Sequence, residues 1–150
     1  MTRRGWRKLQ SPVVPFLPAA LAWAVLIEVG LRVFPFRVLA RRLGVRLALA
    51  DETAQGLDLQ LQGEQRLTDA DANAWYATYA VMRRWPFGGD GKCLRETLLA
   101  ARMLRHLQPR VVIGVAKLDG VVRAHAWLLI DDFVLDATAG VYVPLRSWTE

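Results

Sequence analysis

The chain has very few side chains that bind metals or form disulfides, since its 150 residues include one cysteine, Cys93, and two histidines, His106 and His125. One cysteine cannot form an internal disulfide, so nothing in the sequence indicates an oxidising compartment, and we expect a cytoplasmic protein. A structural zinc ion takes four ligands, which these three side chains do not supply. We therefore expect neither a metal nor another cofactor.

Acidic residues are also scarce relative to basic ones. The chain has 14 aspartates and glutamates against 20 lysines and arginines, which gives a net charge of +6. Such an excess is typical of proteins that bind nucleic acids, anionic membranes or acidic peptides. The basic residues are scattered in pairs such as Arg41-Arg42 and Arg83-Arg84, and no nucleic-acid motif accompanies them. We expect solvated helix faces and no nucleic-acid partner, with an acidic peptide or protein partner as the alternative.

The sequence lacks an uninterrupted apolar run of membrane-spanning length. Its main candidate, Val13–Ile27, follows a basic segment as in a signal peptide, but it has 15 residues, contains Pro15 and Pro18, and ends at Glu28. A transmembrane helix needs roughly 20 apolar residues, and no clear small-x-small cleavage site follows. We expect a buried or partner-facing helix here, with peripheral membrane contact as the alternative.

The pattern of apolar residues predicts a helical part followed by a mixed core. Leu17 to Val33 has the spacing of a helix, and the polar stretch that ends at residue 67 is typical of a linker. The pattern from Val38 to Leu43 predicts a short amphipathic helix. Thr68, with Asp71 three residues later, resembles a capping box that begins another helix, which Pro86 ends. The segment that carries Cys93 predicts a further helix. With 53% hydrophobic residues, we expect one core over residues 68–150 and a helical extension and linker over residues 1–67.

Three β segments follow the cysteine helix. Valine- and isoleucine-rich runs at 110–117 and 121–130 are separated by Asp119-Gly120, a strong hairpin signal. Asp131-Asp132 forms a second two-residue turn before a third strand at 133–136. The expected fold class is therefore α+β, with a cysteine helix packed on an antiparallel sheet.

Cys93 and His125 form the most informative pair in the chain. Cys93 follows a glycine-rich loop at the start of a helix, where free N–H groups and the helix dipole favour a thiolate and could hold an oxyanion. His125 lies in a β-patterned run, between two alanines. A thiol at a helix start followed by a histidine on a strand is typical of papain- and transglutaminase-type nucleophiles. A buried structural cysteine and a core histidine are the alternative interpretations.

Asp136 is the third candidate and depends on strand register. If Asp131-Asp132 is a two-residue turn, Trp127 pairs with Asp136. Because opposed residues share a face of the sheet, Asp136 then lies on the face of His125 and diagonal to it. Its carboxylate could orient and stabilise the imidazolium. A one-residue slip would place it on the other face.

Three segments show a resemblance to a known family. At Lys92-Cys93-Leu94, Val112-Ile113-Gly114-Val115 and Ala124-His125-Ala126-Trp127, the chain resembles the transglutaminase-like leader peptidases of lasso peptide biosynthesis. The likeness is to the form in which the protease and the leader-binding domain are separate proteins. It covers nearly the whole chain, including Arg83-Arg84-Trp85-Pro86 and Pro144-Leu145.

The resemblance implies a papain/transglutaminase-like core with a Cys-His-Asp triad of Cys93, His125 and Asp136. It implies cysteine-dependent removal of the leader from a ribosomally made precursor peptide. The implied partners are the precursor, a small leader-binding protein of winged-helix type, and an ATP-dependent cyclase that acts on the freed amine. Two other functions stay open: an acyltransferase on the same fold, and a catalytically inactive module that binds the precursor.

Overall fold

The computed structural model describes residues 13–48, 67–87, 89–131, 133–136 and 141–145. Its elements in chain order are η1 (Val14–Phe16), α2 (Leu17–Val33), α3 (Phe36–Leu43), β1 (Arg46–Leu47), α5 (Asp69–Arg83), η3 (Gly89–Gly91), α6 (Lys92–Met103), η4 (Arg105–Leu107), β2 (Arg110–Leu118), β3 (Val121–Ile130), β4 (Phe133–Val134) and β5 (Val143–Pro144). The predicted linker before Thr68 lies almost entirely outside the described residues.

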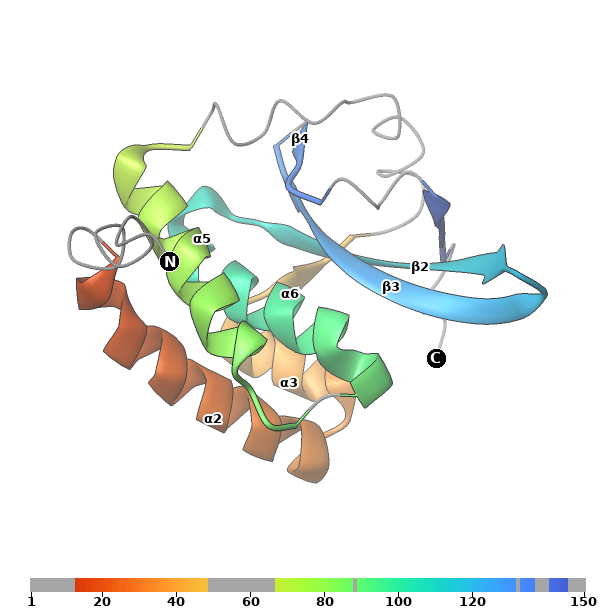
Figure 1. Ribbon diagram of the computed structural model, residues 1–150, viewed down its shortest axis with the longest axis horizontal. Helices are drawn as coiled ribbons and strands as arrows, with labels where there is room; N and C mark the ends of the chain where they lie inside the picture. Colours follow the sequence, from red (N-terminus) through yellow and green to blue (C-terminus); the bar gives the residue numbers. More distant parts are fainter. Residues whose placement is uncertain (1–12, 49–66, 88, 132, 137–140, 146–150) are drawn as a thin grey trace, which may run out of the picture.

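The helices and the sheet form two parts that lie side by side. Figure 1 shows α2, α3, α5 and α6 packed together, with the sheet along one side and the β2–β3 hairpin extending past the helices. The sheet has the order β1-β2-β3-β4, and β5 also pairs with β2. The α+β class is confirmed. The expectation of a purely antiparallel sheet is wrong, because β1 from the N-terminal part of the chain pairs in parallel with β2.

The predicted hairpin turns set the register of β2, β3 and β4. Asp119 and Gly120 have φ angles of 52° and 81°, as a tight two-residue turn requires. After the second turn, Ile130 pairs with Phe133 and Leu129 with Val134. This is the predicted register, although β4 ends at Val134 rather than Asp136.

One hydrophobic core joins the N-terminal helices to the rest of the chain. Ile27 of α2, Leu98 and Leu99 of α6, and Leu128 of β3 belong to the same buried cluster. Each is at most 2% exposed, so α2 packs on the cysteine helix itself. The domain division between residues 67 and 68 stays a prediction.

The capping box at the start of α5 is confirmed. The Asp71 backbone N–H donates to Thr68 Oγ1 at 3.2 Å, and the Thr68 N–H donates to Asp71 Oδ2 at 3.3 Å. The other carboxylate oxygen of Asp71 lies 2.7 Å from His106 Nε2. His106 therefore ties the segment after α6 to the start of α5.

The α2 helix has the predicted bounds, but the argument that it is too short to span a membrane is wrong. The helical run continues past Glu28 to give a 20-residue segment, Val14–Val33, with a mean hydropathy of 1.9, long and apolar enough to cross a membrane. Glu28 does not end the helix, because it is buried and paired (see below). In the most apolar stretch of this segment 28% is buried, so most of it lies at the surface of the described structure.

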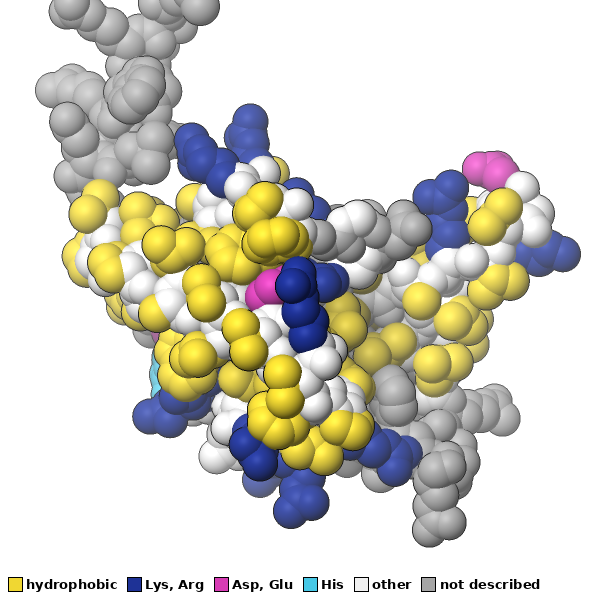
Figure 2. Space-filling view, turned by 90° about the horizontal axis from the view of Figure 1, so that it is seen from below, with side chains coloured by type: hydrophobic (Ala, Val, Ile, Leu, Met, Phe, Trp, Pro, Cys, Tyr) yellow, Lys and Arg dark blue, Asp and Glu magenta, His cyan; other side chains and the backbone are white. Residues whose placement is uncertain are grey.

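Much of the outward face of α2 is apolar. Leu21, Val25, Leu26, Val29 and Val33 are each about half exposed or more. Figure 2, seen from below the helices, shows hydrophobic side chains over much of this face, with basic side chains around it and a basic and an acidic group near its middle. The prediction of a partner-facing helix and the alternative of membrane contact both stay open.

Candidate active site

Cys93 lies in the first turn of α6, as predicted. It is the second residue of the helix, after the N-cap Gly91, and its side chain is partly exposed. The first N–H groups of a helix have no partner within the helix and carry a partial positive charge. The thiol therefore lies where a thiolate and the oxyanion of an intermediate would both be favoured.

His125 lies in the middle of β3, opposite Gly114 of β2. Its ring stacks on Tyr142, with 4.9 Å between the ring centres, and on Trp127, with 6.1 Å between the ring centres. A Cβ atom at Gly114 would come within 2.7 Å of the Trp127 ring and 2.9 Å of the Val143 carbonyl oxygen. Gly114 therefore lets Trp127 and β5 approach closely, and these aromatic contacts fix the plane of the imidazole.

Asp136 reaches His125 as the register argument requires. Its Oδ2 atom lies 2.5 Å from His125 Nε2, and the two side chains are 28% and 17% exposed. The structure thus brings these two candidates into direct contact.

Trp127 and Tyr142, which hold the imidazole, were not singled out from the sequence. The available signal for Trp127 was its place two residues after His125 in a predicted strand, which puts both side chains on one face of the sheet.

Cys93, His125 and Asp136 line one hollow of about 370 Å³. It lies between α5, α6 and β3, and one wall is aromatic, with Trp75, Tyr76 and Tyr79. All three predicted site residues therefore open onto the same space, with room for part of a peptide.

A buried hydrogen bond fixes the cysteine helix against the histidine strand. Thr97 Oγ1 donates to the backbone carbonyl of Ala126 at 2.9 Å. Thr97 is one turn after Cys93, and Ala126 is next to His125. This bond, which links residues 29 apart in sequence, helps to set the position of the thiol relative to the imidazole.

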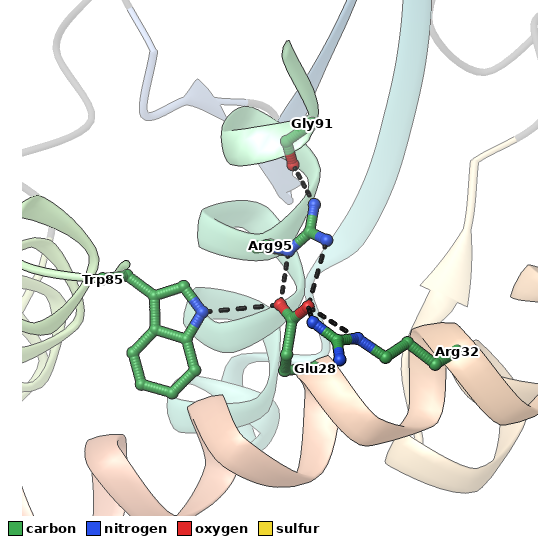
Figure 3. A network of polar contacts seen from close by, with 5 residues as sticks. All are labelled: Glu28, Arg32, Trp85, Gly91 and Arg95. Carbon is green, nitrogen blue, oxygen red and sulfur yellow. Dashed lines mark hydrogen bonds and ion pairs between the residues drawn. The ribbon is translucent and has the colours of Figure 1, made fainter. Parts of the chain in front are cut away.

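A second polar network joins α2 to the start of α6 (Figure 3). Glu28 accepts hydrogen bonds from Arg95 Nε at 2.6 Å, from Arg32 Nη2 at 3.0 Å and from Trp85 Nε1 at 3.4 Å. Arg95 also donates from Nη1 to the Gly91 carbonyl oxygen at 3.1 Å. Glu28 is 6% exposed, so a buried carboxylate and its cations connect the two helices next to Cys93.

Part of the free energy of unfolding depends on the ionised carboxylate of Glu28 in this network, so it decreases at acid pH. The hydrogen bond from Arg95 is the main cause that lowers the pKa of Glu28 from 4.5 to about 2, against the opposing effect of burial. Because the folded-state pKa is the lower one, the stabilisation is present above pH 4.5 and is lost as the pH falls towards 2. We expect about 2 kcal/mol of unfolding free energy to disappear in that range, since Arg32 is exposed and part of the effect is screened.

Urea unfolding between pH 6 and pH 2.5 measures this loss. Glu28→Gln should be less stable than wild type at pH 6 and should lose less stability on acidification. Asp71, whose pKa is also lowered, provides the acid dependence that remains in the variant. Parallel pH profiles for the two proteins would contradict the assignment to Glu28.

A larger hollow of about 660 Å³ lies away from these residues. Arg37, Arg41, Arg46 and Arg110 line it. It includes no cysteine or histidine, so it is a cationic surface rather than a site of nucleophilic chemistry.

Comparison with known protein families gives a match that covers most of the chain. The family model described as the transglutaminase-like superfamily matches residues 30–146. That range contains Cys93, His125 and Asp136, and it begins just after Glu28. No curated protein and no solved structure matches the chain.

Proposed function

Because the chain belongs to the transglutaminase-like superfamily, we propose that it is a cysteine peptidase with Cys93 as nucleophile, His125 as acid–base and Asp136 as the partner of His125. The superfamily supports cysteine peptidase or acyltransferase-type activity. The observation that carries the proposal is that Cys93, at the start of α6, opens onto the same hollow as the bonded pair of His125 and Asp136.

The roles in the proposed reaction follow from which atoms are engaged. Asp136 contacts Nε2 of His125, so Nδ1 is the ring nitrogen that exchanges a proton with the thiol. The thiolate attacks the peptide carbonyl, and N–H groups at the start of α6 stabilise the resulting oxyanion. His125 then protonates the leaving amine as the C–N bond breaks.

Water completes the cycle. His125 removes a proton from a water molecule that attacks the thioester carbonyl, and the carboxylic acid leaves as the Cys93 sulfur takes up the proton. The leaving amine of the first step carries a free N-terminus. In a precursor peptide, that is the group that a later ring-closing reaction would use.

We propose that the substrate is a lasso peptide precursor, from which the enzyme removes the leader. The resemblance of the cysteine, histidine and Arg83-Arg84-Trp85-Pro86 segments to stand-alone leader peptidases supports this choice. The partners would be a winged-helix leader-binding protein and an ATP-dependent cyclase, and the reaction would take place in the cytoplasm.

Mass spectrometry of a mixture of the protein, its leader-binding partner and the precursor tests the proposal. A leader-sized fragment that wild type produces and Cys93→Ala does not would support it and identify the scissile bond. An intact precursor after incubation with folded wild-type protein and bound partner would count against leader removal.

Acyl transfer is the second candidate, because the same superfamily supports it. The thioester would then be attacked by an amine instead of water. Adding a primary amine such as glycine methyl ester separates the two: amide products that form in preference to acid indicate a transferase. A thiol with ordinary reactivity towards iodoacetamide, together with no product of either kind, would indicate the inactive binding module.

A further inference from the structure

The hollow around Cys93 contains a carboxylate that the proposed reaction does not use. Among the described residues that line it, the acidic ones are Asp136 and Glu96. Asp136 bonds to His125, whereas no hydrogen bond or ion pair holds Glu96 within the described part of the chain. Glu96 is three residues after Cys93 on α6 and therefore lies on the same face of that helix.

The surroundings of Glu96 favour a positive partner. Burial raises the pKa of Glu96 above its usual 4.5, the negative charge of Asp136 adds to this, and Lys92 and His125 oppose it. Tyr76 and Tyr79, which are 50% and 53% exposed, line the same hollow. A cation that entered would meet a carboxylate and two aromatic side chains, a combination that binds ammonium and guanidinium groups.

We propose that Glu96 selects peptides that place a lysine or arginine side chain beside the bond that Cys93 attacks. This inference rests on the proposed peptidase function and specifies its substrate. The tyrosines contact the apolar stem and the charged end of the substrate side chain, and Glu96 pairs with the charge. Glu96 is thus a specificity residue, whereas Cys93 and His125 carry out the bond cleavage.

A pair of peptides that differ by one group tests the proposal. One carries arginine beside the scissile bond and the other carries citrulline, which has the same shape and no charge. Wild type should cleave the arginine peptide with a kcat/KM about tenfold higher or more, as expected for a charge-assisted hydrogen bond. Glu96→Lys should reverse the preference, so that a glutamate peptide becomes better than the arginine peptide.

Glu96→Gln should abolish the preference for arginine over citrulline. Asp119→Asn is the matched control. It makes the same change in charge at the hairpin turn, where asparagine tolerates the positive φ of Asp119, so the arginine preference should persist. Equal cleavage of the two peptides by wild type overturns the proposal. Binding to Cys93→Ala provides a second readout: if nothing is cleaved, the peptidase function fails, and the ratio of the two Kd values still decides the role of Glu96.

A separate observation concerns the bridge from α2 to the cysteine helix. Arg95 is two residues after Cys93, and it holds both Glu28 and the carbonyl of Gly91, the N-cap of α6 (Figure 3). A Cβ atom at Gly91 would lie 2.7 Å from Arg95 Nη1, so a larger residue there would displace the guanidinium from this position. One guanidinium thus fixes the turn that carries the thiol relative to a helix more than 60 residues away in sequence.

We infer that Glu28 and Arg95 are positioning residues for Cys93. They act through the backbone of residues 91–93 and touch neither substrate nor the reacting atoms. The family match begins at residue 30, so the carboxylate of this bridge comes from outside the matched region. This inference also rests on the proposed function of Cys93 as nucleophile.

Alkylation by iodoacetamide tests the bridge without any knowledge of the substrate. Glu28→Gln and Arg95→Gln should each lower the alkylation rate by about tenfold, as expected for a slightly misplaced nucleophile. The double variant should lose no more than the worse single variant, because both remove one connection.

Two controls separate positioning from stability. Arg32→Gln removes a partner of Glu28 that does not contact α6, and it should keep the wild-type alkylation rate. Ile27→Ala destabilises the same stretch of α2 by opening a cavity, and its folded fraction should also react normally. An alkylation rate that is unchanged in Arg95→Gln, or equally lowered in Ile27→Ala, overturns the inference.

Discussion

Cys93→Ala is expected to lower kcat/KM for the precursor by about 10⁶-fold, the size of the loss when an enzyme nucleophile is removed. A methyl group cannot form the acyl-enzyme, and no second cysteine exists in the chain to replace it. Binding of the precursor should survive, because the aromatic wall and Glu96 of the hollow are untouched. Single-turnover cleavage followed by mass spectrometry measures the loss, and fluorescence titration measures the remaining affinity.

The control for this variant is its stability. Cys93 is only partly buried in the first turn of α6, so the smaller side chain should leave a small cavity and a free energy of unfolding within about 1 kcal/mol of wild type. Cys93→Ser offers a matched change that replaces the thiol by a hydroxyl of similar shape, which is a much weaker nucleophile. Cleavage at the wild-type rate by a folded Cys93→Ala protein would remove the peptidase proposal altogether.

The parts of the site that could be predicted from sequence are those with a local signal. The position of Cys93 followed from a glycine-rich loop before an apolar helix, and His125 from an alternating strand. Asp136 followed from counting through a two-residue turn, and the observed pairing of Ile130 with Phe133 has the register that the count assumed. Each step used residues within about ten positions of one another.

The parts that were missed depend on contacts between distant segments. Glu28 and Arg95 are 67 residues apart, and nothing near either residue indicates the other. In the sequence, Glu28 resembled the end of an apolar run. In the fold its carboxylate pairs with two arginines, and the helix continues to Val33. The bounds of α2 were predicted correctly, whereas the apolar run within it was taken to end at Ile27.

Short strands were missed for a related reason. β1 and β5 are two residues long, which is too short for alternation to show in the sequence. They form by pairing with the edge of β2 that β3 does not occupy. Arg46 lies opposite Arg110, and Pro144 lies opposite Gly114. β1 follows α3 after two residues, so the position at which α3 ends determines the direction of β1. That position depends on how α3 packs on the other helices.

His125→Ala is expected to lower kcat/KM by about 10⁴-fold, the upper range for the loss of a general acid–base group. The thiol then lacks a proton acceptor, and the leaving amine lacks a donor. Added imidazole should restore part of the activity in a concentration-dependent way, because the deletion leaves a gap between Tyr142 and Trp127 that suits a flat ring of that size. The same addition should have no effect on Cys93→Ala.

Asp136→Asn provides a graded comparison that identifies which part of the His125–Asp136 contact matters. Asparagine can still accept a hydrogen bond from Nε2–H but carries no charge, so orientation is retained while stabilisation of the imidazolium is lost. We expect a decrease of about 10- to 100-fold, between wild type and His125→Ala, because one charge-assisted hydrogen bond is replaced by a neutral one. A loss as large as that of His125→Ala would mean that the asparagine amide donates to Nε2 and holds the imidazole in the wrong tautomer. Activity equal to wild type would mean that Asp136 only holds the ring in place, together with Tyr142 and Trp127.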